Sequence, residues 1–256
     1  MSQVKSTEFI SKEGEPSPGD ATPAQAAESM REHAHTLARN LPWMPSVRSS
    51  KVFPDRSRQL AAELRAALQV DRRGAATSPV SNALRQNTTL LESCFTDVYE
   101  SLYRLRKIPH VRRSDGIIVP RILAIAEDSL RTLRYRCSKR TLVFYLRAFQ
   151  EITVLDLAEL WTLSAAFKLV LLERLVEHAR VPAVAADDGE EATRALESLR
   201  KINRIPWRQV VEPLIAFDSI LQKDPTGVYC QMEPMSRDLY RNEVANIARS
   251  SDLSEQ

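Results

Sequence analysis

Apolar side chains recur at helical spacing along most of this chain, and they are densest between Asp156 and His178. Asp156 is a favourable N-cap, and Glu159 can return a hydrogen bond to the cap amide, so the pair predicts a capping box. Beyond it, leucine, alanine and tryptophan fill a wide arc, while Thr162 and the glutamates fall on an opposing polar arc. A helix that is apolar over most of its circumference must be covered by several neighbours. We therefore expect this segment, which ends near Arg180, to be the central helix of the fold.

Lys168 departs from this pattern because it points out of the middle of the apolar arc. Its stem can pack while the ammonium group reaches solvent at the rim, or it can form a partly buried ion pair with a carboxylate from a neighbouring helix. A catalytic lysine is a third interpretation, and the sequence leaves all three open. Charges interrupt any run of about 20 apolar residues here, so the segment does not predict a membrane-spanning helix.

The same spacing predicts further helices on both sides of the central one. Pro120 is expected to start one of them, Ser138 to cap another, and Asp224–Gly227 to form a turn. No stretch alternates with period two for long enough to predict a strand. Residues 106–118 are expected to be a basic connector and residues 185–191 a solvent-exposed break. The other predicted helices run from about 24 to 39, 56 to 70, 78 to 105, 122 to 133, 190 to 202, 206 to 222 and 236 to 248.

Three regions follow from this reading. Residues 1–23 are polar and rich in Ser, Glu, Pro and Gly, which predicts a disordered tail. Residues 24–77 are expected to hold N-terminal helices and a linker, and residues 78–256 to form the main helical domain. The expected fold class is all-α, an irregular multi-helix bundle of roughly eight helices.

Composition narrows the candidate chemistry. Only 6 of the 256 residues are glycine, which argues against a glycine-rich phosphate loop. The three cysteines share no close spacing, so they predict buried apolar packing in a reducing compartment rather than a disulfide or zinc framework. No serine lies between glycines, and no histidine is placed as in a catalytic triad. We expect no catalytic residue, no metal site and no cofactor.

Two charged stretches remain to be explained. Asp187–Glu191 predicts a solvated helix start. Residues 131–140 form a basic run around Tyr135, which indicates a phosphate or anionic-lipid contact, a solvated connector, or a surface that pairs with the acidic tract. The net charge of +3 neither demands nor excludes an anionic partner. His33 and His35 fall on different helix faces and make a poor metal pair. The three tryptophans are expected to anchor the core or helix junctions.

Two stretches resemble the cyclic β-1,2-glucan synthase family, large glycosyltransferases of the bacterial inner membrane. The first joins Leu146-Arg-Ala-Phe-Gln-Glu151 to Glu159-Leu-Trp-Thr-Leu163 and Lys168-Leu-Val-Leu-Leu-Glu-Arg-Leu175. The second, more specific, joins Ser198-Leu-Arg-Lys-Ile202 and Trp207 to Asp224-Pro-Thr-Gly-Val-Tyr-Cys-Gln-Met232 and Ser236-Arg-Asp-Leu-Tyr-Arg241. The resemblance covers roughly residues 78 to 256. It departs from the family at Lys168, where the family has Arg, and at Ser164, where it has Pro. A Gly-Tyr-Pro-Arg-Val-Tyr signature survives only around Pro120-Arg121.

The resemblance implies a role for the chain. In that family this helical segment precedes the glycosyltransferase domain and its membrane helices on the cytoplasmic side, and the whole enzyme builds a cyclic glucan from UDP-glucose. No Asp-x-Asp metal site followed by membrane spans occurs in this sequence. The chain is therefore expected to be a non-catalytic N-terminal fragment that scaffolds the remainder of the synthase polypeptide at the inner membrane face. The residues expected to carry interaction or structure are Trp161, Lys168, Glu173, Trp207, Asp224, Tyr229, Arg237, Asp238, Tyr240 and Arg241.

An alternative reading is a free-standing helical module. It would bind a protein partner or an anionic membrane surface through residues 104–113 and 131–140. Nucleic acid is not an expected partner in either reading. A soluble enzyme in its own right is a third hypothesis.

Overall fold

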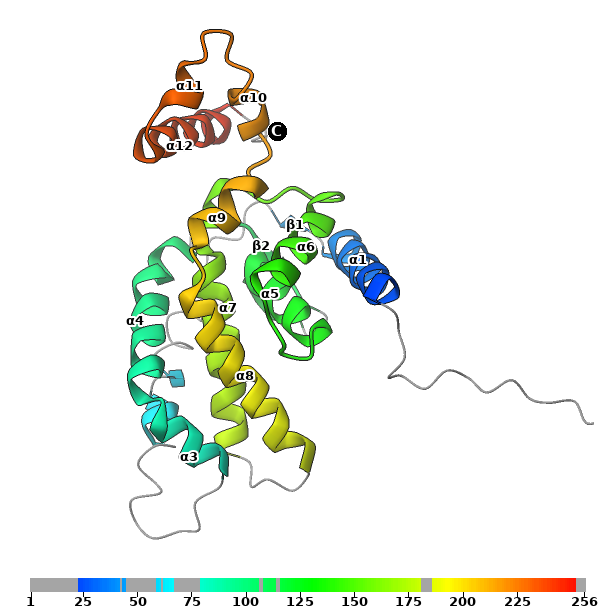
Figure 1. Cartoon of the computed structure of the whole chain (residues 1–256), viewed down its shortest axis with the longest axis vertical. Helices are drawn as coiled ribbons and strands as arrows, with labels where there is room; N and C mark the ends of the chain where they lie inside the picture. The colour runs from blue at the N-terminus through cyan, green and yellow to red at the C-terminus, as the bar shows by residue number, and fades with distance from the viewer. Residues whose placement is uncertain are drawn as a thin grey trace, which may run out of the picture.

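The computed structural model describes residues 23–41, 43–44, 59–60, 62–66, 79–105, 108–113, 116–180 and 186–251. Within these ranges the fold is all-α, as predicted, with one small sheet (Figure 1). The predicted tail lies outside the described residues up to position 22. Of the helix predicted over 56–70, residues 59–60 and 62–66 are described and helical.

The helices are more numerous than predicted. They are α1 (Pro23–Asn40), α3 (Pro79–Gln86), α4 (Thr88–Leu105), α5 (Arg121–Thr132), α6 (Lys139–Gln150), α7 (Leu157–Arg180), α8 (Ala186–Arg204), α9 (Trp207–Val211), the 3-10 turn η2 (Glu212–Leu214), α10 (Asp218–Leu221), α11 (Val228–Gln231) and α12 (Pro234–Ser250). The strands are β1 (Trp43–Met44), β2 (His110–Arg112) and β3 (Ile118–Pro120).

The central position of α7 is confirmed. This 24-residue helix packs against α4, α5 and α8, and Leu163, Phe167 and Leu171 on it are fully buried. Burial of each such side chain contributes about 1.5–3 kcal/mol. The amide of Asp156 donates to Glu159 Oε2 at 2.9 Å, which is one half of the predicted capping box. The polar arc, however, faces solvent only in part: Glu159 and Thr162 are both 0% exposed, whereas Glu177 near the end of the helix is exposed.

The connector predicted over 106–118 contains part of a β-hairpin instead. Strands β1, β2 and β3 form an antiparallel sheet in that order, with Val111 paired to Val119. Both valines are buried, and Gly116 at φ 81° lies in the turn between β2 and β3. Strands of two or three residues are too short to show alternation, which is why the pattern missed them.

Four of the predicted helices are corrected. The stretch from 79 to 105 is interrupted at Asn87, whose side chain donates to the Ala83 carbonyl at 2.6 Å. Helix α8 begins at Ala186, inside the stretch predicted as an exposed break. The helix predicted over 206–222 is split into α9, η2 and α10, because Pro213 cannot continue an α-helix. The last helix begins at Pro234 rather than at Ser236.

Candidate functional site in the C-terminal cap

The predicted site residues fall into two separate groups. Trp161, Lys168 and Glu173 lie on α7. Six others lie in what we call the C-terminal cap, residues 212–250, which comprises η2, α10, α11 and α12 and sits at one end of the bundle (Figure 1). Trp207 lies between the two groups on α9. The six cap residues are Asp224, Tyr229, Arg237, Asp238, Tyr240 and Arg241.

The second interpretation of Lys168 is the one that the structure supports. The residue is 4% exposed, and its ammonium group forms an ion pair with Asp97 on α4. The Asp97 side chain is 45% exposed, so the pair lies at the edge of the core. Lys168 therefore links α7 to α4 rather than lining a reactive pocket.

Trp207 acts as a helix-junction anchor, as predicted. Trp207 donates from Nε1 to the Ile202 carbonyl at 3.2 Å, and its ring stacks on Phe167 with centroids 6.2 Å apart. Trp161 is half-buried against the core. These contacts fix the α8–α9 corner on α7. The side chain of Trp43 lies outside the described part of the chain.

A buried ion pair that the sequence did not predict joins α5 to α7. Arg121 donates from Nε to Glu159 Oε1 at 2.8 Å and from Nη2 to the other carboxylate oxygen. Arg121 also donates to the Val154 carbonyl at 3.2 Å. No pattern in the sequence links these two residues, which lie 38 positions apart.

The cap is organised around Arg241. This side chain on α12 is 1% exposed and donates from Nε to Asp218 Oδ1 at 2.8 Å. Its Nη1 donates to Glu212 Oε1 at 3.2 Å and to Asp238 Oδ1 at 3.0 Å. Tyr229 donates its phenol proton to Asp218 at 2.5 Å. One guanidinium therefore fastens η2, α10 and α11 to α12.

The surroundings of this network shift the pKa values of Asp218 and Tyr229. Burial tends to raise the pKa of Asp218, but hydrogen bonds from Arg241 and Tyr229 outweigh it and hold that pKa below its ordinary value. Burial, reinforced by the hydrogen bond to Asp218, raises the pKa of Tyr229 to about 12. At neutral pH Asp218 is therefore ionised, Tyr229 is neutral and Arg241 is cationic. These groups hold one another in place and are not poised for proton transfer.

The predicted turn at Asp224 is confirmed and has a capping role. The Asp224 carboxylate accepts from the Thr226 amide at 2.9 Å and from the Tyr229 amide at 3.1 Å, and so caps α11. These hydrogen bonds lower the pKa of Asp224, led by the one from the Thr226 hydroxyl. Gly227 adopts φ 67°, a left-handed conformation that favours glycine.

The remaining cap residues differ in their surroundings. Asp238 accepts from Arg208 Nη2 at 2.6 Å, which ties α12 to α9. Arg237 is half-buried and forms no ion pair with any residue that the structure describes. Tyr240 is 53% exposed and packs edge-on against Tyr229, with ring centroids 6.3 Å apart.

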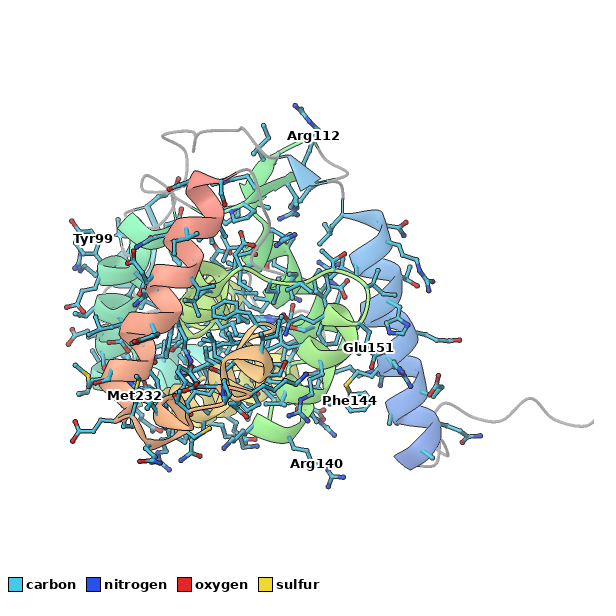
Figure 2. All side chains as sticks on the ribbon, turned by 90° about the horizontal axis from the view of Figure 1, so that it is seen from above. Tyr99, Arg112, Arg140, Phe144, Glu151 and Met232 are labelled. Atoms are coloured by element: carbon cyan, nitrogen blue, oxygen red, sulfur yellow. The ribbon has the colours of Figure 1, made fainter. Side chains whose placement is uncertain are left out.

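The outer side of the cap is apolar. Helix α12 buries Arg241, Ala245 and Ala248 on one face, yet Met235 is 73% exposed and Leu239 is 70% exposed on another. Figure 2, viewed from the cap end, shows α12 on the outside of the molecule. A helix of a monomeric domain normally turns polar side chains outward, so this outer face is unusual. The exposed apolar residues of the cap are Ile220, Val228, Met235, Leu239, Tyr240 and Ile247.

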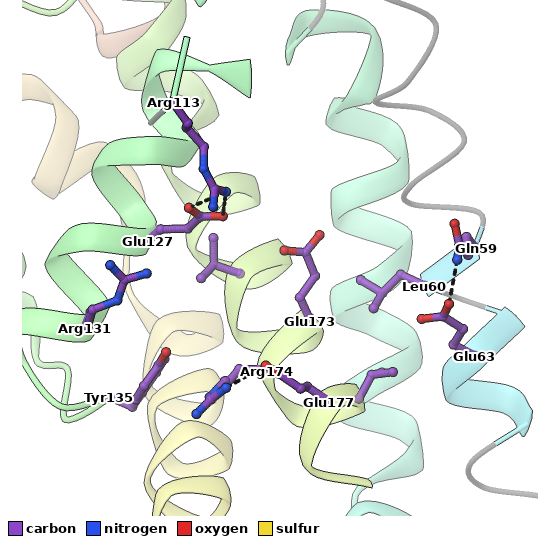
Figure 3. Close-up of a pocket in the computed structure, with 12 residues that line it drawn as sticks. Gln59, Leu60, Glu63, Arg113, Glu127, Arg131, Tyr135, Glu173, Arg174 and Glu177 are labelled. Atoms are coloured by element: carbon purple, nitrogen blue, oxygen red, sulfur yellow. Dashed lines mark hydrogen bonds and ion pairs between the residues drawn. The ribbon is translucent and has the colours of Figure 1, made fainter. Parts of the chain in front are cut away.

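Glu173 lines a different feature, a cavity of about 800 Å³ between α5, α7 and the residues Gln59, Leu60 and Glu63 (Figure 3). On its walls Arg113 Nη1 donates to Glu127 at 2.9 Å, and Arg174 Nε donates to Glu191 at 2.5 Å. In each pair the two charges neutralise one another. The lining presents no nucleophile next to a base, so the arrangement does not suggest catalysis.

The cysteines are only partly as predicted. Cys94 and Cys137 are buried, and burial raises their pKa to about 11 and about 12. Cys230 is exposed, contrary to the expectation of buried packing, because α11 is a single turn at the surface.

The described ranges contain no cluster of three or more potential metal ligands. Nor is any helix among them long and apolar enough to cross a bilayer. His33 contacts Asp128 and His35 contacts Glu151, so each pairs separately with a carboxylate. No protein-family model matches this chain, and no match is found among curated proteins.

Proposed function

We propose that this chain is a non-catalytic helical scaffold, the accessory region of a cyclic β-1,2-glucan synthase-like glycosyltransferase, and that it docks onto the transferase and membrane domains through its C-terminal cap. This would place it at the cytoplasmic face of the inner membrane. The family named in this proposal rests on the resemblance of residues 146–175 and 198–241 to that family.

The observation that carries the docking role is the two-sided burial pattern of α12. Arg241 and the alanines hold one face to the body, while Met235 and Leu239 leave an apolar stripe on the opposite face. Exposed apolar patches rimmed by polar residues mark interaction surfaces in soluble domains. Covering each of these side chains would contribute roughly 1–2 kcal/mol to association.

The experiment is co-expression of this chain with the remainder of a homologous synthase, followed by affinity capture and a glucan synthesis assay. The variant M235D/L239D places two carboxylates in the stripe and should abolish capture, because each would be buried without a partner. The matched control Y99D/I152D changes two apolar residues of 64% and 41% exposure outside the cap and should leave capture intact.

Two results would contradict the proposal. One is a cap variant that is captured as well as the unaltered chain. The other is glucose transfer from UDP-glucose by the chain alone, which would make it an enzyme rather than a scaffold.

A further inference from the structure

Charge is segregated sharply along this chain. Between Ser129 and Gln150 there are six basic residues and no acidic one, although the whole chain carries a net charge of only +3. The rest of the molecule therefore has a net charge of −3. We call the six residues the basic face: Arg131, Arg134, Arg136, Lys139, Arg140 and Arg147.

All six side chains are exposed, and none forms an ion pair with a carboxylate among the residues that the structure describes. Several arginines elsewhere in the described ranges do form ion pairs, as Arg31 does with Glu151 and Arg174 with Glu191. The acidic tract at 187–191 does not neutralise the basic face either, because Glu190 forms its ion pair with Arg194. The interpretation of residues 131–140 as pairing with that tract is therefore wrong for the glutamates that the structure describes.

The basic face occupies the connector between α5 and α6 and the outward side of α6. Arg140, Phe144 and Arg147 follow one another at spacings of four and three, so they lie on one helical stripe. Phe144 is 38% exposed between the two arginines. Figure 2 shows Arg140 projecting outward from the start of α6. An aromatic ring therefore projects from within a cationic surface.

The connector is held in a costly conformation. Arg134 donates its amide to the Arg131 carbonyl at 2.9 Å and Tyr135 to the Leu130 carbonyl at 2.8 Å, which is the Schellman pattern that ends a helix. The left-handed position of that motif is usually glycine, but here Arg134 occupies it at φ 47°, at a cost of about 1 kcal/mol. The hydroxyl of Ser198 accepts from the Cys137 amide at 3.0 Å and also donates to the Tyr135 carbonyl, fixing the connector on α8.

A hollow of about 430 Å³ adjoins the connector. Arg134 and Arg136 line it together with Arg194, and the first two turns of α1 form its other wall. No acidic residue lies in the first turn of α1. The hollow is thus bordered by cationic groups and by a helix N-terminus, and is large enough to accept a phosphate group.

We propose that the basic face binds the headgroups of anionic phospholipids at a bilayer surface. A lipid surface supplies both parts of the match, phosphates for the cations and an apolar layer beneath them for Phe144. Duplex nucleic acid offers phosphates on its outside but no apolar partner for the ring. The proposal extends the predicted stretch 131–140 to Arg147. In the other predicted stretch, 104–113, Arg113 pairs with Glu127 and is engaged within the fold.

This inference stands apart from the docking role of the cap, since it depends on no catalytic partner. It requires only that the purified chain bind vesicles by itself. The cap variant M235D/L239D should bind them as the unaltered chain does, so that failure of either proposal leaves the other standing.

The test is co-sedimentation of the full chain with phosphatidylcholine vesicles, with or without about one-third phosphatidylglycerol. Binding should require the anionic lipid and should weaken steeply between about 0.05 and 0.5 M salt. Each cation that lies at the bilayer surface contributes about a fivefold increase in affinity, so R136Q/R140Q should bind roughly 30-fold more weakly. The matched control R65Q/K223Q neutralises two exposed cations elsewhere and should remain within about twofold of the unaltered chain.

Variant R134G separates binding from folding. Glycine relieves the left-handed strain, so its thermal midpoint should not fall, whereas vesicle binding should fall about fivefold. Equal binding to uncharged vesicles, or equal losses in the control variant, would overturn the proposal. Equally strong binding to a homopolymeric RNA that is lost in the same variants would assign the face to nucleic acid instead.

Discussion

Replacing Arg241 with leucine should open the C-terminal cap while leaving the rest of the bundle folded. The side chain is 1% exposed and is the common partner of Glu212, Asp218 and Asp238. Removing one member of a buried ion pair costs about 3–5 kcal/mol, because the other charge is left without compensation. We expect a cost at the lower end of this range, because only Asp218 is left nearly buried without its partner. Glu212 stays partly hydrated, and Asp238 keeps its ion pair with Arg208.

The expected loss of about 3 kcal/mol is a large share of the 5–15 kcal/mol that stabilises a typical domain. It should fall mainly on the cap, since α12 contacts the body chiefly through α7. Amide hydrogen exchange read by mass spectrometry should then show faster exchange in 212–250 and unchanged exchange in α7. Urea unfolding followed by circular dichroism gives the magnitude.

Arg237 on the same helix supplies the control. It is half-buried without an ion pair among the described residues, so R237L should cost about 1 kcal/mol or less. The difference between the variants should also shrink on acidification, because an unpartnered Asp218 regains stability by taking up a proton. An R241L variant within about 1 kcal/mol of the unaltered chain at pH 7 would refute the view that this network holds the cap.

Three further results follow from the same contacts. Because folding lowers the pKa of Asp218, the ionised carboxylate should stabilise the fold fully above the ordinary carboxyl pKa of about 3.9, and this stabilisation should be lost as the pH falls further. An acid titration followed by tyrosine fluorescence should show this loss as a step, and the D218N variant should lack the step. Lys168→Met should leave the free energy of unfolding unchanged or raise it slightly, whereas Asp97→Asn should lower it by about 2 kcal/mol because it leaves a buried ammonium group unpaired. Urea unfolding curves of the two variants that give equal losses of stability would contradict this asymmetry. Ellman's reagent should titrate Cys230 alone in the folded chain and all three cysteines in denaturant, since burial raises the pKa of the other two; a second fast thiol would contradict their burial.

The sequence predicted those parts of the fold that depend on local periodicity. The span of α7, the cap at Ser138 and the turn at Asp224 are all set by residues within one or two helical turns of each other. The small sheet could not be predicted in this way. Its short strands are held by pairing between β1 and β2, which are separated by more than 60 residues.

The polar positions were harder to place than the apolar ones. Periodicity assigned Glu159 to a polar arc but could not tell solvent from a buried guanidinium. That distinction depends on Arg121, which reaches the same spot from another helix. Lys168 is a second example. The sequence left open whether its stem packs or its ammonium group forms an ion pair, and the ion pair depends on Asp97, which lies on α4. Buried charges are specified by tertiary contacts that no single-helix pattern contains.

The cap residues that carry the family resemblance have an internal structural role. The most specific matching stretch contains Tyr229, Asp238 and Arg241, yet Tyr229 and Arg241 are buried and both join the internal network of the cap. Their fixed spacing is explained by the geometry that one guanidinium imposes on three short helices, without any ligand or partner. A partner would instead meet side chains that lie between those positions, such as Met235 and Leu239. Variants at the buried network should therefore change stability first, and variants on the outer stripe should change association without changing stability.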